Sequence, residues 1–166
     1  MKHRDLPMAH RNLPLLLLQA RERVINRFRP LLNAQRITEQ QWRIVRLLLE
    51  SGPLEPRQIG EACNISSPSL AGVLARMDNM GWIERQRFDN DQRRVRVSLS
   101  VRSRALAERL APQIEAVYAD LEARVGVEFT RRLYAMLDEL VATLDAGDAG
   151  DAPARAGARA ATGTGD

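Results

Sequence analysis

The sequence predicts a mainly α-helical fold with a small β-hairpin: a winged helix-turn-helix module between long N- and C-terminal dimerisation helices. Three observations support this prediction. Two short helical segments are joined by a brief connection, two strand-like segments follow directly, and the segments at both ends carry helical apolar stripes. The chain of 166 residues suffices for one ordinary domain, and an apolar content of 45% allows a buried core.

The composition excludes several classes of protein. A single cysteine excludes an intramolecular disulfide and multi-cysteine metal sites, and the two histidines, His3 and His10, form no helical zinc motif. The longest apolar run, residues 13–18, contains Pro14 and is far shorter than the roughly 20 residues that cross a bilayer. We therefore expect no metal, no cofactor, no membrane partner and a cytoplasmic location. No nucleophile–base pair or phosphate loop indicates an enzyme.

Two helices are expected before the helix-turn-helix. Residues 13–34 carry an apolar stripe, and Pro30 should kink or end this helix locally. The segment Thr38-Glu-Gln-Gln41 is a capping box that begins the second helix. Gly52, followed by a proline, ends it.

The helix-turn-helix pattern comes next. A short third helix begins at Pro56, which suits a first helical turn, and ends near Cys63. Ser67 is expected to cap a fourth helix over residues 68–80, before Gly81. The third and fourth helices are therefore separated by only a few residues, as in a helix-turn-helix.

A hairpin follows, with strands over residues 82–87 and 94–99 and a polar turn over 88–92. Ser100 then caps a long helix that Pro112 should bend, and Gly126 separates it from a last helix. The apolar stripes of the end helices exceed what the module can cover, which favours a two-fold dimer. The predicted organisation is an N-terminal arm (1–11), dimerisation helices (12–34 and 101–144), the winged module (about 38–100) and a disordered tail (145–166).

The basic charge is concentrated where a duplex would be read. Residues 66–104 contain eight arginines and four acidic residues, which equals the chain's net charge of +4. Small residues on the fourth helix allow close approach, and Arg76 reaches a guanine edge or a phosphate. In the hairpin, Asp91 orients Arg93 for a narrow minor groove. The alternatives are an ordinary amphipathic helix with a serine cap and a solvated turn. The predicted DNA contacts are Ser66, Ser67, Ser69, Gly72, Arg76, Arg87, Asp91, Arg93 and Arg94.

These residues resemble the MarR family of winged-helix regulators over residues 12–144. The resemblance is carried by residues 65–81 and 82–87, and by Asp91-Gln-Arg-Arg94 with Val97-Ser-Leu-Ser100. Within the family, residues 15–22, 26–30 and 38–43 more narrowly resemble repressors of homoprotocatechuate (4-hydroxyphenylacetate) degradation. The resemblance implies a homodimer on a palindromic operator in double-stranded DNA, released by a small aromatic acid.

Five residues are candidates for binding such an effector. Arg21 interrupts an apolar helix face, and a buried arginine requires a partner such as an aryl carboxylate. Arg46 stands one turn after Trp42, which places a cation beside an aromatic wall. His10 and Arg11 could close the pocket from the N-terminal arm. The alternative is that Arg21 pairs with an acid of the partner subunit and that Trp42 only fills the core.

The leading hypothesis is a repressor of an aromatic-acid catabolic operon that 4-hydroxyphenylacetate or 3,4-dihydroxyphenylacetate releases from DNA. One alternative is a MarR-type regulator of another phenolic or stress response, which a different aromatic acid would release. Another is an architectural DNA-binding protein without an effector, which would discriminate weakly among duplexes.

Overall fold

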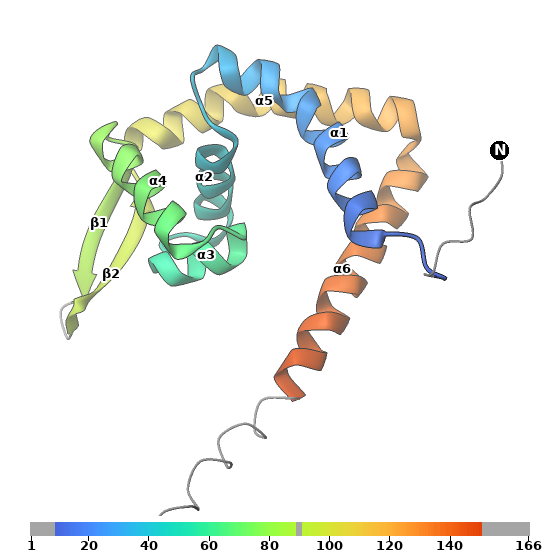
Figure 1. Ribbon diagram of the computed structural model, residues 1–166. Helices are drawn as coiled ribbons and strands as arrows, with labels where there is room; N and C mark the ends of the chain where they lie inside the picture. Colours follow the sequence, from blue (N-terminus) through green and yellow to red (C-terminus); the bar gives the residue numbers. More distant parts are fainter. Residues whose placement is uncertain (1–8, 89–90, 151–166) are drawn as a thin grey trace, which may run out of the picture. The chain divides into compact units, whose positions relative to one another are not determined.

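The computed structural model describes residues 9–88 and 91–150, apart from the side chains of residues 88, 91, 92 and 147–150. The Asp91 side chain, most of the predicted arm and the tail after Gly150 therefore lie outside the described residues. The described elements follow the predicted order (Figure 1), and the predicted fold class is confirmed. They are α1 (Leu13–Ala34), α2 (Glu39–Ser51), α3 (Pro56–Cys63), α4 (Ser67–Asn79), β1 (Ile83–Phe88), β2 (Asp91–Leu99), α5 (Val101–Val125) and α6 (Val127–Gly150).

Two compact units divide the chain after Val117. In the first, α2, α3 and α4 pack around one core together with the hairpin and the first part of α5. On α4, Leu70, Val73, Leu74 and Met77 face this core and are all at most 4% exposed, whereas Met80, which helical spacing places on the same face, is only half-buried. The largest fully buried side chains of this core are Leu32, Ile44, Leu48, Ile59, Leu74, Met77, Leu110 and Ile114.

The helix ends agree with the sequence except at the start of α4 and at the end of α6, which is described below. The Thr38 capping box is present, with Gln41 N–H donating to Thr38 Oγ1 at 3.2 Å. The cap of α4, however, is Ser66 and not Ser67, because the Ser66 carbonyl accepts the first helical bond from Leu70 N–H at 2.8 Å. Helix α1 continues through Pro30 to Ala34, its predicted end, so this proline does not end the helix.

The hairpin is longer than predicted. Its strands run to Phe88 and from Asp91, so the connection is shorter than the five-residue turn expected, because antiparallel pairing extends further. Trp82 lies outside β1: its N–H donates to the Met77 carbonyl at 2.8 Å, at the end of α4. Leu54, before α3, forms an isolated bridge to Val97 that anchors β2 to the helical core.

The second unit consists of the end of α5 and α6. Gly126 separates the two helices at φ 94°, a left-handed conformation that favours glycine, as the sequence predicted. Helix α6 continues to Gly150, so the disorder predicted from residue 145 is wrong for residues 145–150: a helix once formed extends without apolar side chains. Within the described residues, no helix is long and apolar enough to cross a membrane.

Candidate functional site

The exposed strip of α4 is the first part of the candidate DNA interface. Ser66, Ser67 and Ser69 are exposed at the N-terminal end of the helix, where backbone N–H groups and the helix dipole favour an anion. Arg76 is exposed and Gly72 half-buried. A Cβ added at Gly72 would lie 3.5 Å from Arg76 Nη1, so the guanidinium folds back along the helix over this glycine. The strip presents hydroxyls at one end and a cation about two to three turns later.

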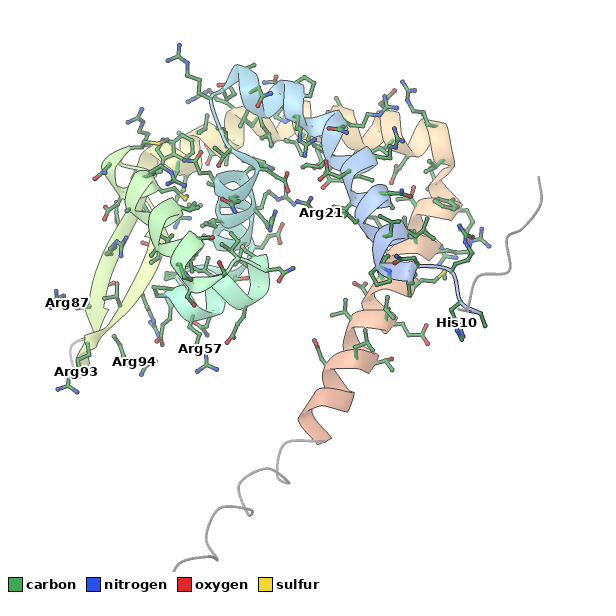
Figure 2. All side chains as sticks on the ribbon, in the orientation of Figure 1. His10, Arg21, Arg57, Arg87, Arg93 and Arg94 are labelled. Carbon is green, nitrogen blue, oxygen red and sulfur yellow. The ribbon has the colours of Figure 1, made fainter. Side chains whose placement is uncertain are left out.

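The wing supplies the second part. Arg87, Arg93 and Arg94 are exposed, and Figure 2 shows Arg87 and Arg93 near the wing tip and Arg94 closer to α3. Positive charge on a narrow hairpin is suited to the phosphates or the minor groove of a duplex. The predicted pairing between Asp91 and Arg93 falls on a side chain outside the described residues.

Glu55 contacts one of these wing arginines, which the sequence analysis did not predict. Arg94 Nη2 donates to Glu55 Oε1, and Arg94 Nε lies 3.4 Å from Glu55 Oε2. The Arg94 guanidinium holds the pKa of the Glu55 carboxyl below its ordinary value. Glu55 is next to Leu54, whose backbone exchanges hydrogen bonds with Val97 at 2.8 and 3.0 Å. The backbone bridge thus brings the two charged residues together, although they are far apart in the sequence.

A groove of about 760 Å³ lies beside the α4 strip. It is lined by α3, the N-terminal half of α4 and β1, and it includes Ser66 and Ser67 together with Arg57 and Arg85. The two arginines come from different elements and pair with Glu61 and Asp78, at 2.8 and 3.0 Å. The groove therefore extends the basic and hydroxyl-bearing surface of α4 towards α3 and the wing.

A smaller cavity on α2 brings together two of the five predicted effector contacts. Trp42 and Arg46 line a space of about 170 Å³ whose opposite wall is α5, with Leu49 and Ile114 among its apolar residues. Arg46 Nη2 also pairs with Glu50 Oε1 at 2.7 Å. Trp42 and Arg46 thus border one cavity, and their contact with an effector stays a prediction.

The other three candidates lie outside the lining of this cavity. His10 and Arg11 are exposed before α1. The sequence predicted that Arg21 is buried. This prediction is wrong, since 46% of the Arg21 side chain is exposed. In this chain it contacts Glu39 on α2, and it pairs with Glu22 at 2.9 Å. The alternative expectation was an acid of the partner subunit, whereas the acids that pair with Arg21 here, Glu22 and Glu39, belong to the same chain.

Glu39 is, after Glu55, the second residue that sequence reasoning missed. It is the first residue of α2, directly after the Thr38 cap, and it lies one turn before Trp42 on the same helix. The contact of Glu39 with Arg21 therefore lies on the turn of α2 before the turn that carries Trp42 and its cavity. The i,i+4 spacing of Glu39 and Arg43 was a visible signal, and these two residues pair at 2.9 Å.

Cys63 has the environment of a core residue. It is 2% exposed, and burial raises the pKa of its thiol. Both properties disfavour the thiolate, which is the reactive form of cysteine. Within the described residues, no group of three or more histidine, cysteine, aspartate or glutamate side chains could hold a metal ion.

Comparison with known proteins agrees with this geometry. The family model of the MarR family matches residues 37–95. The homoprotocatechuate degradative operon repressor of Escherichia coli is 40% identical over 133 residues, which are 80% of this chain and 90% of that protein. The transcriptional regulator FarR of Neisseria gonorrhoeae is 38% identical over 82% of this chain and 94% of its own.

A solved structure shows the same likeness in three dimensions. The crystal structure of NadR in complex with 4-hydroxyphenylacetate superimposes with a TM-score of 0.74 at 36% identity. The match covers 82% of this chain and 97% of that one. Since this share is larger than the winged module alone, the likeness includes flanking helices.

Proposed function

Because this chain belongs to the MarR family of transcriptional regulators, we propose that it represses an aromatic-acid catabolic operon and leaves DNA when it binds a small phenolic carboxylate. Members of this family are DNA-binding regulators and not enzymes, and they bind DNA as dimers. The proposal for this chain has two parts, a dimeric interface for a palindromic operator and an effector pocket.

The α4 strip and the wing support the operator part. In a two-fold dimer, the two copies of α4 enter successive major grooves about 34 Å apart, and the wings reach the flanking minor grooves. Ser66, Ser67 and Ser69 then meet phosphates at the start of α4, and Arg76 meets a base edge. The uncovered apolar residues of α6, such as Phe129 and Leu133 at 48% and 41% exposure, are available to the second copy.

The cavity at Trp42 and Arg46 is the observation that carries the effector part. An indole provides an apolar wall for an aromatic ring, and a guanidinium pairs with a carboxylate. The volume of about 170 Å³ is below the roughly 300 Å³ at which pockets for larger ligands begin, which favours a one-ring molecule. We assign Arg21, His10 and Arg11 to the same effector from α1 and the arm before it.

Release follows from a shift between two arrangements of the dimer. The operator selects the arrangement in which the two α4 helices match its groove spacing. An effector between α2 and α5 that binds better to an arrangement with another spacing lowers the population of the DNA-binding arrangement. A difference of a few kcal/mol in its binding free energy between the two arrangements suffices. An effector with equal affinity for both arrangements would release nothing.

The test is a titration of 4-hydroxyphenylacetate and 3,4-dihydroxyphenylacetate into a complex of the dimer with a duplex selected from a random-sequence library. We expect both acids to release the duplex, and 4-hydroxyphenylethanol, which lacks the carboxylate, to fail. Arg46→Gln should weaken the response to both acids without weakening DNA binding. Release only by a different aromatic acid would refute the phenylacetate assignment. If no duplex is selected above random sequence, the repressor proposal fails and an architectural role gains support.

A further inference from the structure

Arg43 joins the start of α2 to the end of α3. Its Nη2 donates to Glu39 Oε1 at 2.9 Å, and its Nη1 donates to the Cys63 carbonyl oxygen at 2.5 Å. Cys63 is the last residue of α3, so its carbonyl is among those that lack a partner within the helix and carry the negative end of the dipole. Arg43 therefore supplies both a donor and a positive charge where the turn towards α4 begins.

The turn that follows is tightly constrained. Asn64 has a left-handed backbone with φ 50°, and Ile65 N–H donates back to the Gly60 carbonyl at 2.9 Å. A Cβ at Gly60 would lie 3.2 Å from the Ile65 carbonyl oxygen, so the two backbone segments approach closely. Ser66 already caps α4. Because so short a connection separates the helices, a rotation at Cys63 moves the start of the DNA-reading helix.

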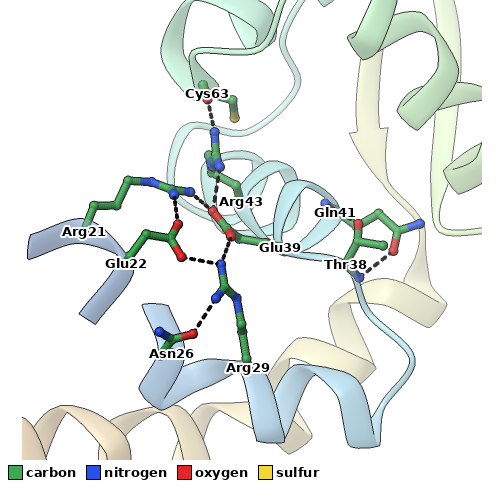
Figure 3. Close-up of polar contacts among 9 residues, drawn as sticks. All are labelled: Arg21, Glu22, Asn26, Arg29, Thr38, Glu39, Gln41, Arg43 and Cys63. Atoms are coloured by element: carbon green, nitrogen blue, oxygen red, sulfur yellow. Dashed lines mark hydrogen bonds and ion pairs between the residues drawn. The ribbon is translucent and has the colours of Figure 1, made fainter. Parts of the chain in front are cut away.

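Glu39 is in turn held by α1 (Figure 3). Arg21 contacts the same Oε1 that accepts from Arg43, and Arg29 Nη2 lies 3.7 Å from Glu39 Oε2. Glu22 pairs with Arg21 at 2.9 Å and with Arg29 at 2.8 Å. These side chains are 23–46% exposed, so each isolated pair would contribute little to stability. The shared carboxylates make them one network, in which a change at one partner alters the others.

We propose that Glu39 and Arg43 form a strut that positions α4 for reading DNA sequence, and that α1 holds this strut through Arg21 and Arg29. Glu39 and Arg43 are positioning residues, because they act through the Cys63 carbonyl. A phosphate contact strengthens binding to every duplex, whereas a strut that sets the direction of α4 affects discrimination between base sequences.

The strut gives the effector a route to α4, and this step rests on the proposed function. An aromatic carboxylate that binds Arg21 as well as Arg46 competes with Glu39 for the Arg21 guanidinium. Glu39 then depends more on Arg29 and Arg43, which changes the contact of Arg43 with the Cys63 carbonyl. The effector thereby acts on the turn before α4 without touching that helix.

The first experiment requires no effector. Arg43→Lys keeps the charge, but one ammonium group cannot span Glu39 and the Cys63 carbonyl as a planar guanidinium does. We expect faster amide hydrogen exchange at residues 64–66 and at least a fivefold smaller ratio of affinities for a library-selected over an unselected duplex. Affinity for the unselected duplex should change less than twofold. The matched control is Arg57→Lys, whose partner Glu61 lies on its own helix, α3.

Two results would overturn the strut. One is an equal loss of affinity for both duplexes, which marks Arg43 as a phosphate contact. The other is unchanged exchange and an unchanged affinity ratio. Should Arg43→Lys fail to fold, Glu39→Gln provides the second variant, with the same two readouts expected to move in the same direction. The double variant should exceed the larger single effect only slightly, because both changes act through one contact.

The second experiment measures coupling. The affinity of 4-hydroxyphenylacetate is determined for the free dimer and for the dimer with saturating selected duplex. Arg43→Lys should change the affinity of 4-hydroxyphenylacetate for the free dimer by less than about twofold. The ratio of its affinities for the free and the duplex-bound dimer should come at least fivefold closer to one. An unchanged ratio would refute the route through the strut. If the wild type binds no phenylacetate, the effector part of the proposed function fails, while amide exchange and duplex discrimination still decide on the strut.

Discussion

The winged module and the C-terminal helices carry the same kind of apolar periodicity with opposite outcomes. In the module, Ile44, Ile59 and Met77 are completely buried within one chain. In α6, Leu133 and Leu144 are 41% and 62% exposed, and no described side chain of residues 118–146 is buried. The comparison shows that a helical stripe predicts which face is apolar but not whether its own chain covers that face. The module builds its core alone, whereas we propose that a second copy of the chain covers the apolar face of α6.

The largest expected effect is in the core of the module. Ile44→Ala should lower the free energy of unfolding by about 2–5 kcal/mol, because it leaves a cavity among side chains that cannot collapse completely. Chemical denaturation of the dimer at fixed protein concentration measures this change. Val101→Ala, at a position 81% exposed at the start of α5 and outside the proposed interface, is the control and should cost far less. Similar losses for both variants would show that burial within one chain does not set the cost of losing an apolar side chain.

A charge on the α6 stripe should separate the subunits. Leu133→Glu places a carboxylate in the proposed interface of each copy, and we expect the dissociation constant of the dimer to rise by at least tenfold, or about 1.4 kcal/mol. Analytical ultracentrifugation over a concentration series gives this constant. Ala135→Glu puts the same charge on nearly the opposite helix face. If both variants remain equally dimeric, the stripe of Leu133 is not the interface.

On the module's exposed face, the wing should affect DNA binding and not folding. Arg93→Ala is expected to reduce the slope of log affinity against log salt by about 0.9 for each phosphate that the wing no longer neutralises, with an unchanged thermal midpoint. Arg76→Ala should also relax base preference, by about 1–3 kcal/mol if Arg76 reads a base edge. Salt titrations on selected and unselected duplexes separate the two roles. An unchanged slope for Arg93→Ala would mean that the wing does not touch DNA.

The smallest effect is expected where Glu55 holds Arg94 of the wing. The pKa of Glu55 is lowered in the folded protein, so its contribution to stability is present above the ordinary value of 4.5 and is lost as the pH falls below it. Glu55→Gln should therefore lower the thermal midpoint slightly at pH 7, and the difference from wild type should shrink below pH 4.5. A difference that is constant with pH would show that the charge of Glu55 does not matter.

Local signals explain which elements could be predicted. The Thr38 capping box, Pro56 and Gly126 act through backbone geometry within a few residues, and the helix boundaries next to them agree with the structure. Ser66 and Ser67 are both acceptable caps, so the sequence could not choose between them. Which of the two serines is the N-cap depends on the course of the backbone after Asn64, which has a left-handed conformation.

Long-range contacts explain what was missed at the candidate site. Arg21 lies on an apolar stripe, which suggested burial, yet it is exposed and contacts Glu39 across two helices. Glu55 and Arg94 meet only because Leu54 bridges to Val97. The one-turn separation of Trp42 and Arg46 was predictable since both lie on one helix, whereas α5 as the opposite wall of their cavity was not.

The sequence by itself determined the order of the elements, the apolar stripes of the end helices and the arginine-bearing wing, because capping, periodicity and alternation are properties of neighbouring residues. Only the tertiary structure decided that Glu39 joins Arg21 to Arg43 and that Arg43 reaches the end of α3. Contacts of this kind depend on how helices cross, and the crossing is set by the packing of many side chains at once. No single stretch of the chain contains that information.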